Sequence, residues 1–71
     1  MEPLFEAYPL TSQGQGKVAR VREAFSAVLQ ALIAECGPSG REIALVRTKL
    51  EEACFYAIRA ISTRTENQEP P

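Results

Sequence analysis

Apolar side chains recur with the period of an α-helix through the second half of the chain, between Ser39 and Ile61. At about 100° per residue they fall on one wide face, the side that a helix turns toward a core. Ser39 and Glu42 have the spacing of a capping box directly ahead of this run. The pattern predicts one long helix that starts at Ser39 and ends around Ser62–Thr63. Its apolar face consists of Ile43, Val46, Leu50, Ala53, Cys54, Ala57, Ala60 and Ile61.

Large apolar residues also occupy the back of this predicted helix. Leu45, Phe55 and Tyr56 project there among charged and polar neighbours. A helix that is apolar on both sides has to bury both of them. A second helix can cover one side, so another subunit or a ligand has to cover the rest.

A second helical pattern begins at Thr11 or Ser12 and runs to Cys36. Ser12 and Gln15 form another capping-box pattern at its start, and the Gly37-Pro38 pair is a typical helix end. The loop to the next helix is so short that the two helices must run antiparallel, as an αα-hairpin. The apolar face of this first helix consists of Val18, Val21, Phe25, Val28, Leu29, Leu32, Ile33 and Cys36.

The sequence therefore predicts an all-α fold with three segments. An extended N-terminal lead covers residues 1–10, the helical hairpin domain covers 11–63, and a polar, Pro-rich tail at 64–71 is expected to be disordered. A chain of 71 residues is only marginally stable alone. We therefore expect the antiparallel hairpin to assemble into a homo-oligomeric helical bundle.

The composition argues against several classes of function and of binding site. A net charge of −1 argues against binding of DNA or long RNA, and a chain with no histidine and two cysteines has too few ligands for a structural zinc. We expect no metal and no cofactor. Cys36 and Cys54 lie too far apart to pair, which suits a reducing cytosol. Neither a signal peptide nor a membrane span is evident.

Two arginines, a nearby tyrosine and Thr48 point to an anion site. Pro9 holds Tyr8 on extended backbone ahead of the first helix, and Arg22 and Arg47 fall at matching edges of the seam between the helices. Each arginine could instead lay its stem on the core or pair with a nearby glutamate, and Tyr8 could staple the lead to the bundle. Two arginines with a tyrosine nearby favour a phosphate and a base as ligands, because guanidinium matches phosphate and aromatic rings stack on bases.

These residues carry a resemblance to the phage anti-CBASS cyclic-oligonucleotide sponge family. Tyr8 with Leu10-Thr11 resembles the family's tyrosine and Leu-Thr pair ahead of helix one, and Arg22 ends an apolar-x-x-apolar-basic pattern. The second helix resembles the family through Arg41, Ile43-Ala44-Leu45, Arg47-Thr48, Leu50, Phe55 and Ile58-Arg59-Ala60-Ile61.

The resemblance implies a protein that assembles into a hexamer and sequesters the cyclic di- or trinucleotide messengers of bacterial CBASS immunity without cleaving them. It would block activation of immune effectors in the cytoplasm of the infected host. Tyr8 and Arg22 would hold a cyclic dinucleotide. Arg41, Arg47 and Thr48 are the candidates for a separate cyclic trinucleotide site between subunits.

An enzyme and a protein-interaction module are the two other classes of function that the sequence brings into question. An enzyme is not expected, because histidine is absent and the adjacent Glu51 and Glu52 point about 100° apart on a helix. A helical hairpin that docks on a host protein through Leu45, Phe55 and Tyr56 is the alternative that the periodicity leaves open.

Overall fold

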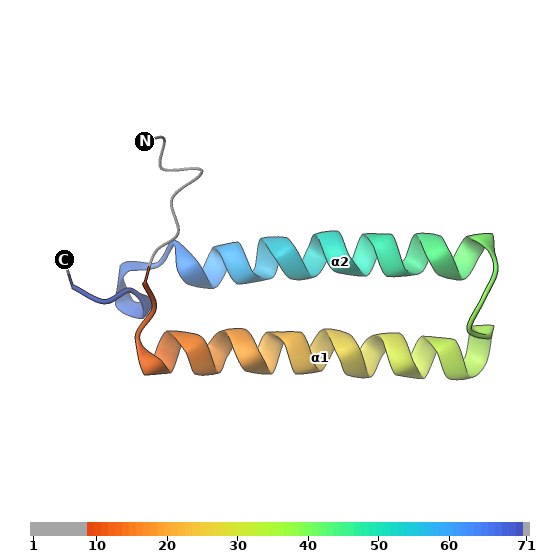
Figure 1. Ribbon diagram of the computed structural model, residues 1–71, viewed down its shortest axis with the longest axis horizontal. Coiled ribbons are helices and arrows are strands. Elements are labelled where there is room, and N and C mark those ends of the chain that lie inside the picture. Colours follow the sequence, from red (N-terminus) through yellow and green to blue (C-terminus); the bar gives the residue numbers. More distant parts are fainter. Residues whose placement is uncertain (1–8, 71) are drawn as a thin grey trace.

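The computed structural model describes residues 9–70 and shows two long helices that run antiparallel, side by side (Figure 1). Helix α1 spans Ser12–Cys36 and helix α2 spans Arg41–Ser62. A single 3-10 turn, η2 (Thr65–Asn67), follows at the end of the hairpin where α1 begins. No strand occurs in the part of the chain that the structure describes, which confirms the predicted all-α hairpin. Residues 1–8, which make up most of the predicted lead, lie outside the described range.

Helix α1 begins at Ser12, one of the two starts expected from sequence, but the predicted capping box of Ser12 and Gln15 is wrong. Thr11 is the N-cap residue, and its Oγ1 accepts a hydrogen bond from the backbone N–H of Gly14 at 3.0 Å. Gln15 donates from Nε2 to the carbonyl of Leu10 at 3.1 Å. Thr11 takes this role because its backbone is extended (φ −65°, ψ 166°), whereas Ser12 is already helical.

The start of α2 also differs from the prediction. The helix begins at Arg41, with Gly40 as its N-cap residue and no side-chain cap, so the capping box of Ser39 and Glu42 is wrong. Gly40 has φ 117° and Gly37 has φ 90°, a backbone region that glycine adopts without steric cost. These two glycines reverse the chain and move the helix start beyond Ser39. The predicted end of α2 is confirmed, because Thr63 follows as its C-cap.

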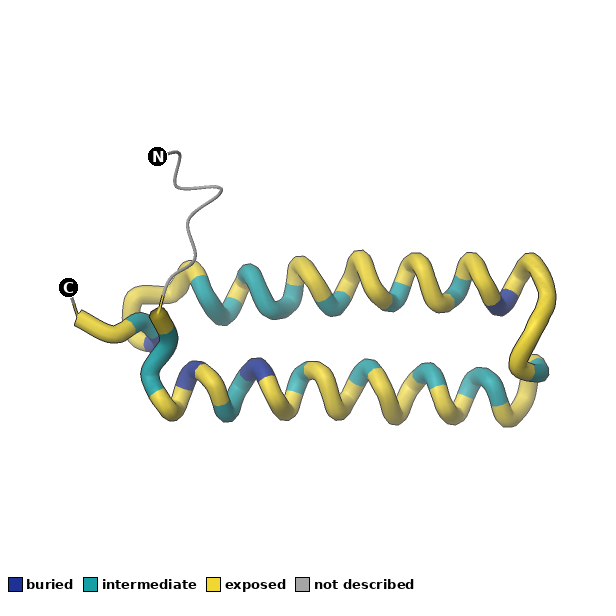
Figure 2. The backbone as a smooth tube through the Cα atoms, viewed as in Figure 1, coloured by how far each residue is buried: buried dark blue, intermediate teal, exposed yellow. Residues whose placement is uncertain are grey.

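Very little of the apolar surface is buried within one chain (Figure 2). Among the described hydrophobic residues only Val18 and Ile43 are buried, and most of the remaining seam between the helices is half-buried. Val28, which the sequence analysis placed on the apolar face of the first helix, is 47% exposed. The molecule measures 46 × 25 × 11 Å, so it is a single layer about as thick as one helix. Its radius of gyration is 15.0 Å, against about 11 Å for a compact chain of this length.

The back of α2 is the most exposed apolar surface. Leu45, Phe55 and Tyr56 are 45%, 57% and 66% exposed, and the two rings contact each other edge to face with centroids 5.3 Å apart. This agrees with the expectation from sequence that one chain leaves this side of α2 uncovered.

The C-terminal segment Arg64–Glu69, which we call the clasp, differs from the disordered tail expected from its composition. It folds back across the open end of the hairpin, and its Asn67 is only 1% exposed. Asn67 accepts a hydrogen bond from Lys17 Nζ at 2.8 Å and donates to the carbonyl of Ile61 at 2.9 Å. Its own carbonyl accepts from the backbone N–H of Thr11 at 2.9 Å. The clasp is therefore ordered by bonds to both helices.

The clasp packs against α1 at Gly14, where the absence of a side chain leaves room for its backbone. A Cβ at this position would lie 2.6 Å from the backbone oxygen of Asn67. We expect Gly14→Ala to lower the free energy of unfolding by about 1–3 kcal/mol, although alanine is the better helix former by ~1 kcal/mol. Gly16→Ala is the matched control, since its Cβ would meet only the flexible end of Arg20, at 3.3 Å.

Thermal unfolding of both variants at one fixed protein concentration provides the measurement. Gly16→Ala should be as stable as the parent or more stable, and Gly14→Ala less stable. Equal shifts in the two variants would mean that the clasp does not press on Gly14.

Candidate ligand-binding groove

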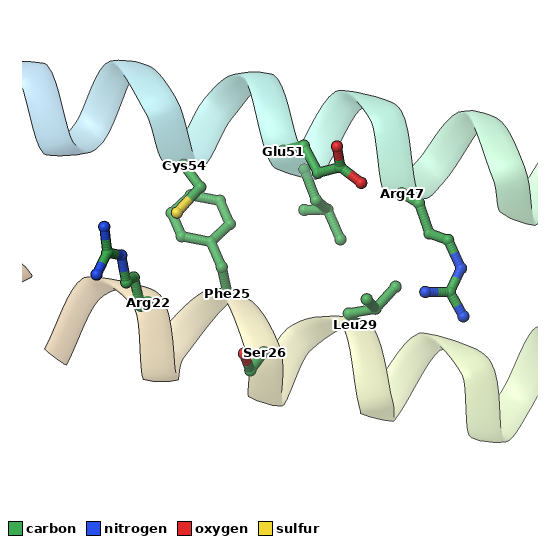
Figure 3. A pocket seen from close by; sticks show the side chains of 8 residues that line it. Arg22, Phe25, Ser26, Leu29, Arg47, Glu51 and Cys54 are labelled. Atoms are coloured by element: carbon green, nitrogen blue, oxygen red, sulfur yellow. The ribbon is translucent and has the colours of Figure 1, made fainter. Parts of the chain in front are cut away.

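A groove of about 300 Å³ lies between the two helices (Figure 3). Phe25, Leu29 and Leu50 give it an apolar floor, and Arg22 and Arg47 lie at its two ends. The full lining consists of Arg22, Phe25, Ser26, Leu29, Arg47, Leu50, Glu51 and Cys54.

The residues that line the groove have the same sequence spacing in both helices. Each helix contributes an arginine followed by residues three, four and seven positions later, which is the spacing that aligns side chains along one helical stripe. Because the helices are antiparallel, Arg22 of α1 lies opposite Cys54, and Arg47 of α2 lies opposite Leu29. Seven residues along a helix correspond to about 10 Å, which is the approximate axial separation of the two arginine positions.

The two arginines are available to a ligand. Within residues 9–70 neither Arg22 nor Arg47 forms an ion pair, although Glu51 lines the same groove. The salt bridge found there joins Lys49 to Glu52 at 3.6 Å on the exposed back of α2. Two guanidinium groups and one carboxylate give the lining a net charge of +1. An anion that enters the groove meets two fork-shaped donors and one carboxylate that it has to avoid.

Two other predicted ligand residues, Arg41 and Thr48, do not line this groove. Arg41 is exposed as the first residue of α2, and Thr48 is exposed with its Oγ1 donating to the Ala44 carbonyl at 3.2 Å. Tyr8 lies outside the described residues. The structure thus brings together Arg22 and Arg47, which the sequence analysis assigned to two different ligands, in a groove that Arg41 and Thr48 do not line.

Sequence reasoning placed several lining residues only in the core. Phe25, Leu29 and Leu50 do pack in the seam, but they also form the floor of the groove. The sequence signal that could have shown this is an arginine followed by lining residues three, four and seven positions later, a pattern that occurs once in each helix. Cys54 is half-buried in the groove, while Cys36, which we expected on the core face, is exposed; both are free thiols.

The described part of the chain contains neither a metal-binding cluster nor a membrane-spanning helix. Residues 9–70 contain no group of three or more His, Cys, Asp or Glu side chains that could hold a metal ion. Neither α1 nor α2 has the length and apolar character that crossing a membrane would require.

The fold and the groove define a two-helix hairpin domain whose helices enclose a basic groove with an apolar floor. A family model described as "Acb2/Tad1, hairpin domain" matches residues 2–62. The chain belongs to this family of phage anti-CBASS cyclic-oligonucleotide sponge proteins, which confirms the resemblance found in the sequence. Neither the curated proteins nor the solved structures gave a significant match. Membership supports an anti-CBASS role of the sponge type in general.

Proposed function

We propose that this protein is a phage sponge that binds cyclic di- or trinucleotide messengers of CBASS in the host cytoplasm and holds them without cleavage. The observation that carries the proposal is a groove with an apolar floor and two arginines, Arg22 and Arg47, that form no ion pair within residues 9–70. Cyclic oligonucleotides combine phosphodiester anions with flat bases. Guanidinium groups pair with the phosphates, and rings such as Phe25 offer stacking surface to the bases.

The cyclic dinucleotide site is shared between two subunits in this proposal. Arg22 lies ten residues beyond the start of α1 at Ser12, which is about 15 Å along the helix. Tyr8 precedes that start in the chain, so one small ring cannot readily contact both side chains of the same chain. Tyr8 of one subunit stacks on a base while Arg22 of a neighbour pairs with a phosphate.

A cyclic trinucleotide site is proposed on α2. Arg41 and Thr48 are both exposed and lie seven residues apart, so they share one stripe of the helix. Arg47 is adjacent in sequence but points into the groove. The three residues can act on one ligand if it lies across the edge of α2, between two subunits.

Homo-oligomerisation, with a hexamer as the proposed state, follows from the same surfaces. Only Val18 and Ile43 are buried among the described hydrophobic residues, and the back of α2 exposes Leu45, Phe55 and Tyr56. Burial of apolar area stabilises at about 25 cal/mol per Å², so a partner on this side supplies core that the single chain lacks.

The test is recovery of the ligand. The protein is incubated with a cyclic dinucleotide or trinucleotide, freed of unbound ligand, heated to unfold it, and the released nucleotide is analysed by chromatography. We expect intact ligand. Linear or hydrolysed products would identify an enzyme and overturn the proposal.

The same experiment separates the alternative function. If no cyclic nucleotide is retained, the exposed apolar back of α2 favours a module that docks on a host protein. In that case the two arginines lie in the groove without a ligand role.

A further inference from the structure

The groove between the helices contains one group that pairing with phosphates does not use, the carboxylate of Glu51. We infer that Glu51 determines base specificity, and that the groove favours cyclic oligonucleotides with guanine over those with adenine alone. The inference rests on the proposed function and names the class of ligand for the same groove.

The position of Glu51 on α2 places its carboxylate along the path between the two arginines. Glu51 follows Arg47 by four residues and precedes Cys54 by three, so the three side chains share one helical stripe. Cys54 lies opposite Arg22, and Glu51 therefore falls between the two arginine ends of the groove (Figure 3). A ligand that contacts both arginines also passes the carboxylate.

The carboxylate of Glu51 has no ion-pair partner among residues 9–70. Arg47 lies at the i,i+4 spacing at which such pairs form, but a basic residue ahead of an acidic one is the less favourable order on a helix. The next residue, Glu52, is paired, since its carboxylate lies 3.6 Å from Lys49 Nζ on the back of α2. Glu51 is thus available to accept hydrogen bonds from a ligand.

An unpaired carboxylate in a groove that binds phosphates has an electrostatic cost. Two guanidinium groups and one carboxylate leave the lining at +1, against +2 without Glu51. The carboxylate repels phosphates and, as an acceptor only, forms no hydrogen bond with them. This cost is offset when the ligand donates hydrogen bonds to Glu51, so the groove favours a ligand with N–H donors.

Guanine supplies those donors. Among the four common bases it alone presents two adjacent donors on one edge, its N1–H and its 2-amino group, and a carboxylate accepts both in a bidentate arrangement. Adenine places its 6-amino group between two ring acceptors, so one carboxylate oxygen would face a lone pair. A good bidentate pair discriminates between bases by about ten- to a hundredfold in affinity.

The groove has room for one base beside the carboxylate. Its volume of about 300 Å³ is at the lower end of the range for small-molecule pockets, roughly 300–1,000 Å³. Phe25 and Leu50 supply apolar surface for the flat face of the base. One base of the cyclic oligonucleotide therefore occupies the centre of the groove, and its phosphates lie toward the arginines.

The first test compares ligands that differ only in their bases. The parent is titrated calorimetrically with cyclic diguanylate, cyclic diadenylate and the corresponding hypoxanthine compound, and cyclic trinucleotides of a single base are compared in the same way. Guanine should bind about ten- to a hundredfold more tightly than adenine. Hypoxanthine, which lacks the 2-amino group, should fall between them. Equal affinities would overturn the role of Glu51.

Glu51→Gln separates base recognition from a structural role. The amide keeps the shape of the side chain, replaces one acceptor by a donor and raises the charge of the lining to +2. It also matches adenine, with which an amide forms a bidentate pair. Affinity for the guanine ligand should fall about tenfold, and affinity for the adenine ligand should rise. Shifts in the same direction would show that Glu51 acts through charge or packing alone, and the inference would be wrong.

Glu52→Gln is the matched control, because it makes the same change one position further along α2, outside the groove. Both glutamates are exposed, so neither substitution is expected to unfold the hairpin. Glu52→Gln should preserve the preference for guanine. If it abolishes that preference as Glu51→Gln does, the effect comes from the net charge of the protein and Glu51 has no specific role.

The imino proton of the ligand reports directly on the contact. With a guanine ligand labelled with nitrogen-15 and saturated with the parent protein, the N1–H resonance should be protected from exchange with water. A saturated complex without a protected N1–H would contradict a hydrogen bond to Glu51.

Failure of the proposed function gives a different result from failure of this inference. A parent that retains neither guanine nor adenine ligands overturns the sponge and the ligand role of Glu51 together. A parent that retains both equally well overturns only the base specificity, and the sponge function stands.

Discussion

Replacement of Tyr8 or Arg22 by alanine is expected to weaken cyclic dinucleotide binding by roughly ten- to a hundredfold. Stacking of a base on an aromatic ring contributes about 1–3 kcal/mol, which corresponds to that range of affinity. Arg22→Ala removes one of the two free guanidinium groups of the groove, so it should also reduce the dependence of binding on salt. Calorimetric titration at two salt concentrations gives both quantities.

Matched variants make this expectation specific. Arg20 lies two residues from Arg22 but lines a different hollow, together with Lys17 and Ile61. Arg20→Ala removes the same charge from the same helix and should cost little affinity. Tyr8→Phe keeps the ring and should be nearly silent. If Tyr8→Ala and Arg22→Ala both bind as tightly as the parent, the site lies elsewhere.

The Arg47→Ala variant distinguishes one binding site that spans the groove from two separate sites for two ligands. If it weakens cyclic trinucleotide binding alone, Arg47 acts with Arg41 and Thr48 at a separate site on α2. If it weakens the dinucleotide as strongly as Arg22→Ala does, one ligand spans both ends of the groove, and the assignment of Arg47 from sequence is wrong.

Introduction of a charge on the back of α2 is expected to break the assembly. Sedimentation of the parent at micromolar concentration should give a mass several times 7.8 kDa. Leu45→Glu should shift it to smaller species, because burying an unpaired carboxylate in an interface costs several kcal/mol. Gln30→Glu adds the same charge at an exposed polar position of α1 and serves as the control. A well-folded monomer of the parent protein would contradict the proposed oligomer.

The hairpin was predictable because its signals are redundant. Helical periodicity marks both helices, and the Gly37-Pro38 pair marks the turn. The caps were less predictable, because polar side chains at adjacent positions satisfy the same pattern. Thr11 and Ser12 both suit a cap, and the backbone conformation decides between them.

The clasp could not be predicted from composition. Its polar, Pro-rich sequence is typical of disorder, yet Asn67 is ordered by Gly14, Lys17 and Thr11, which lie at the other end of the sequence. Only the tertiary fold brings these residues together. The positions of Arg22 and Arg47 followed from helical angle, but the absence of an ion pair with Glu51 depends on side-chain conformation, which periodicity does not determine.

A layer one helix thick has little interior separate from its surface. Phe25, Leu29 and Leu50 hold the seam together and at the same time face the groove. A ligand that packs on these side chains covers apolar area that stays exposed to water in the folded single chain. Because it binds the folded hairpin, it stabilises that state by mass action. Under the proposed function, binding of a messenger and folding of the hairpin are linked equilibria. A change that destabilises the packing of the seam then also weakens binding, and a bound ligand stabilises the packing of the two helices.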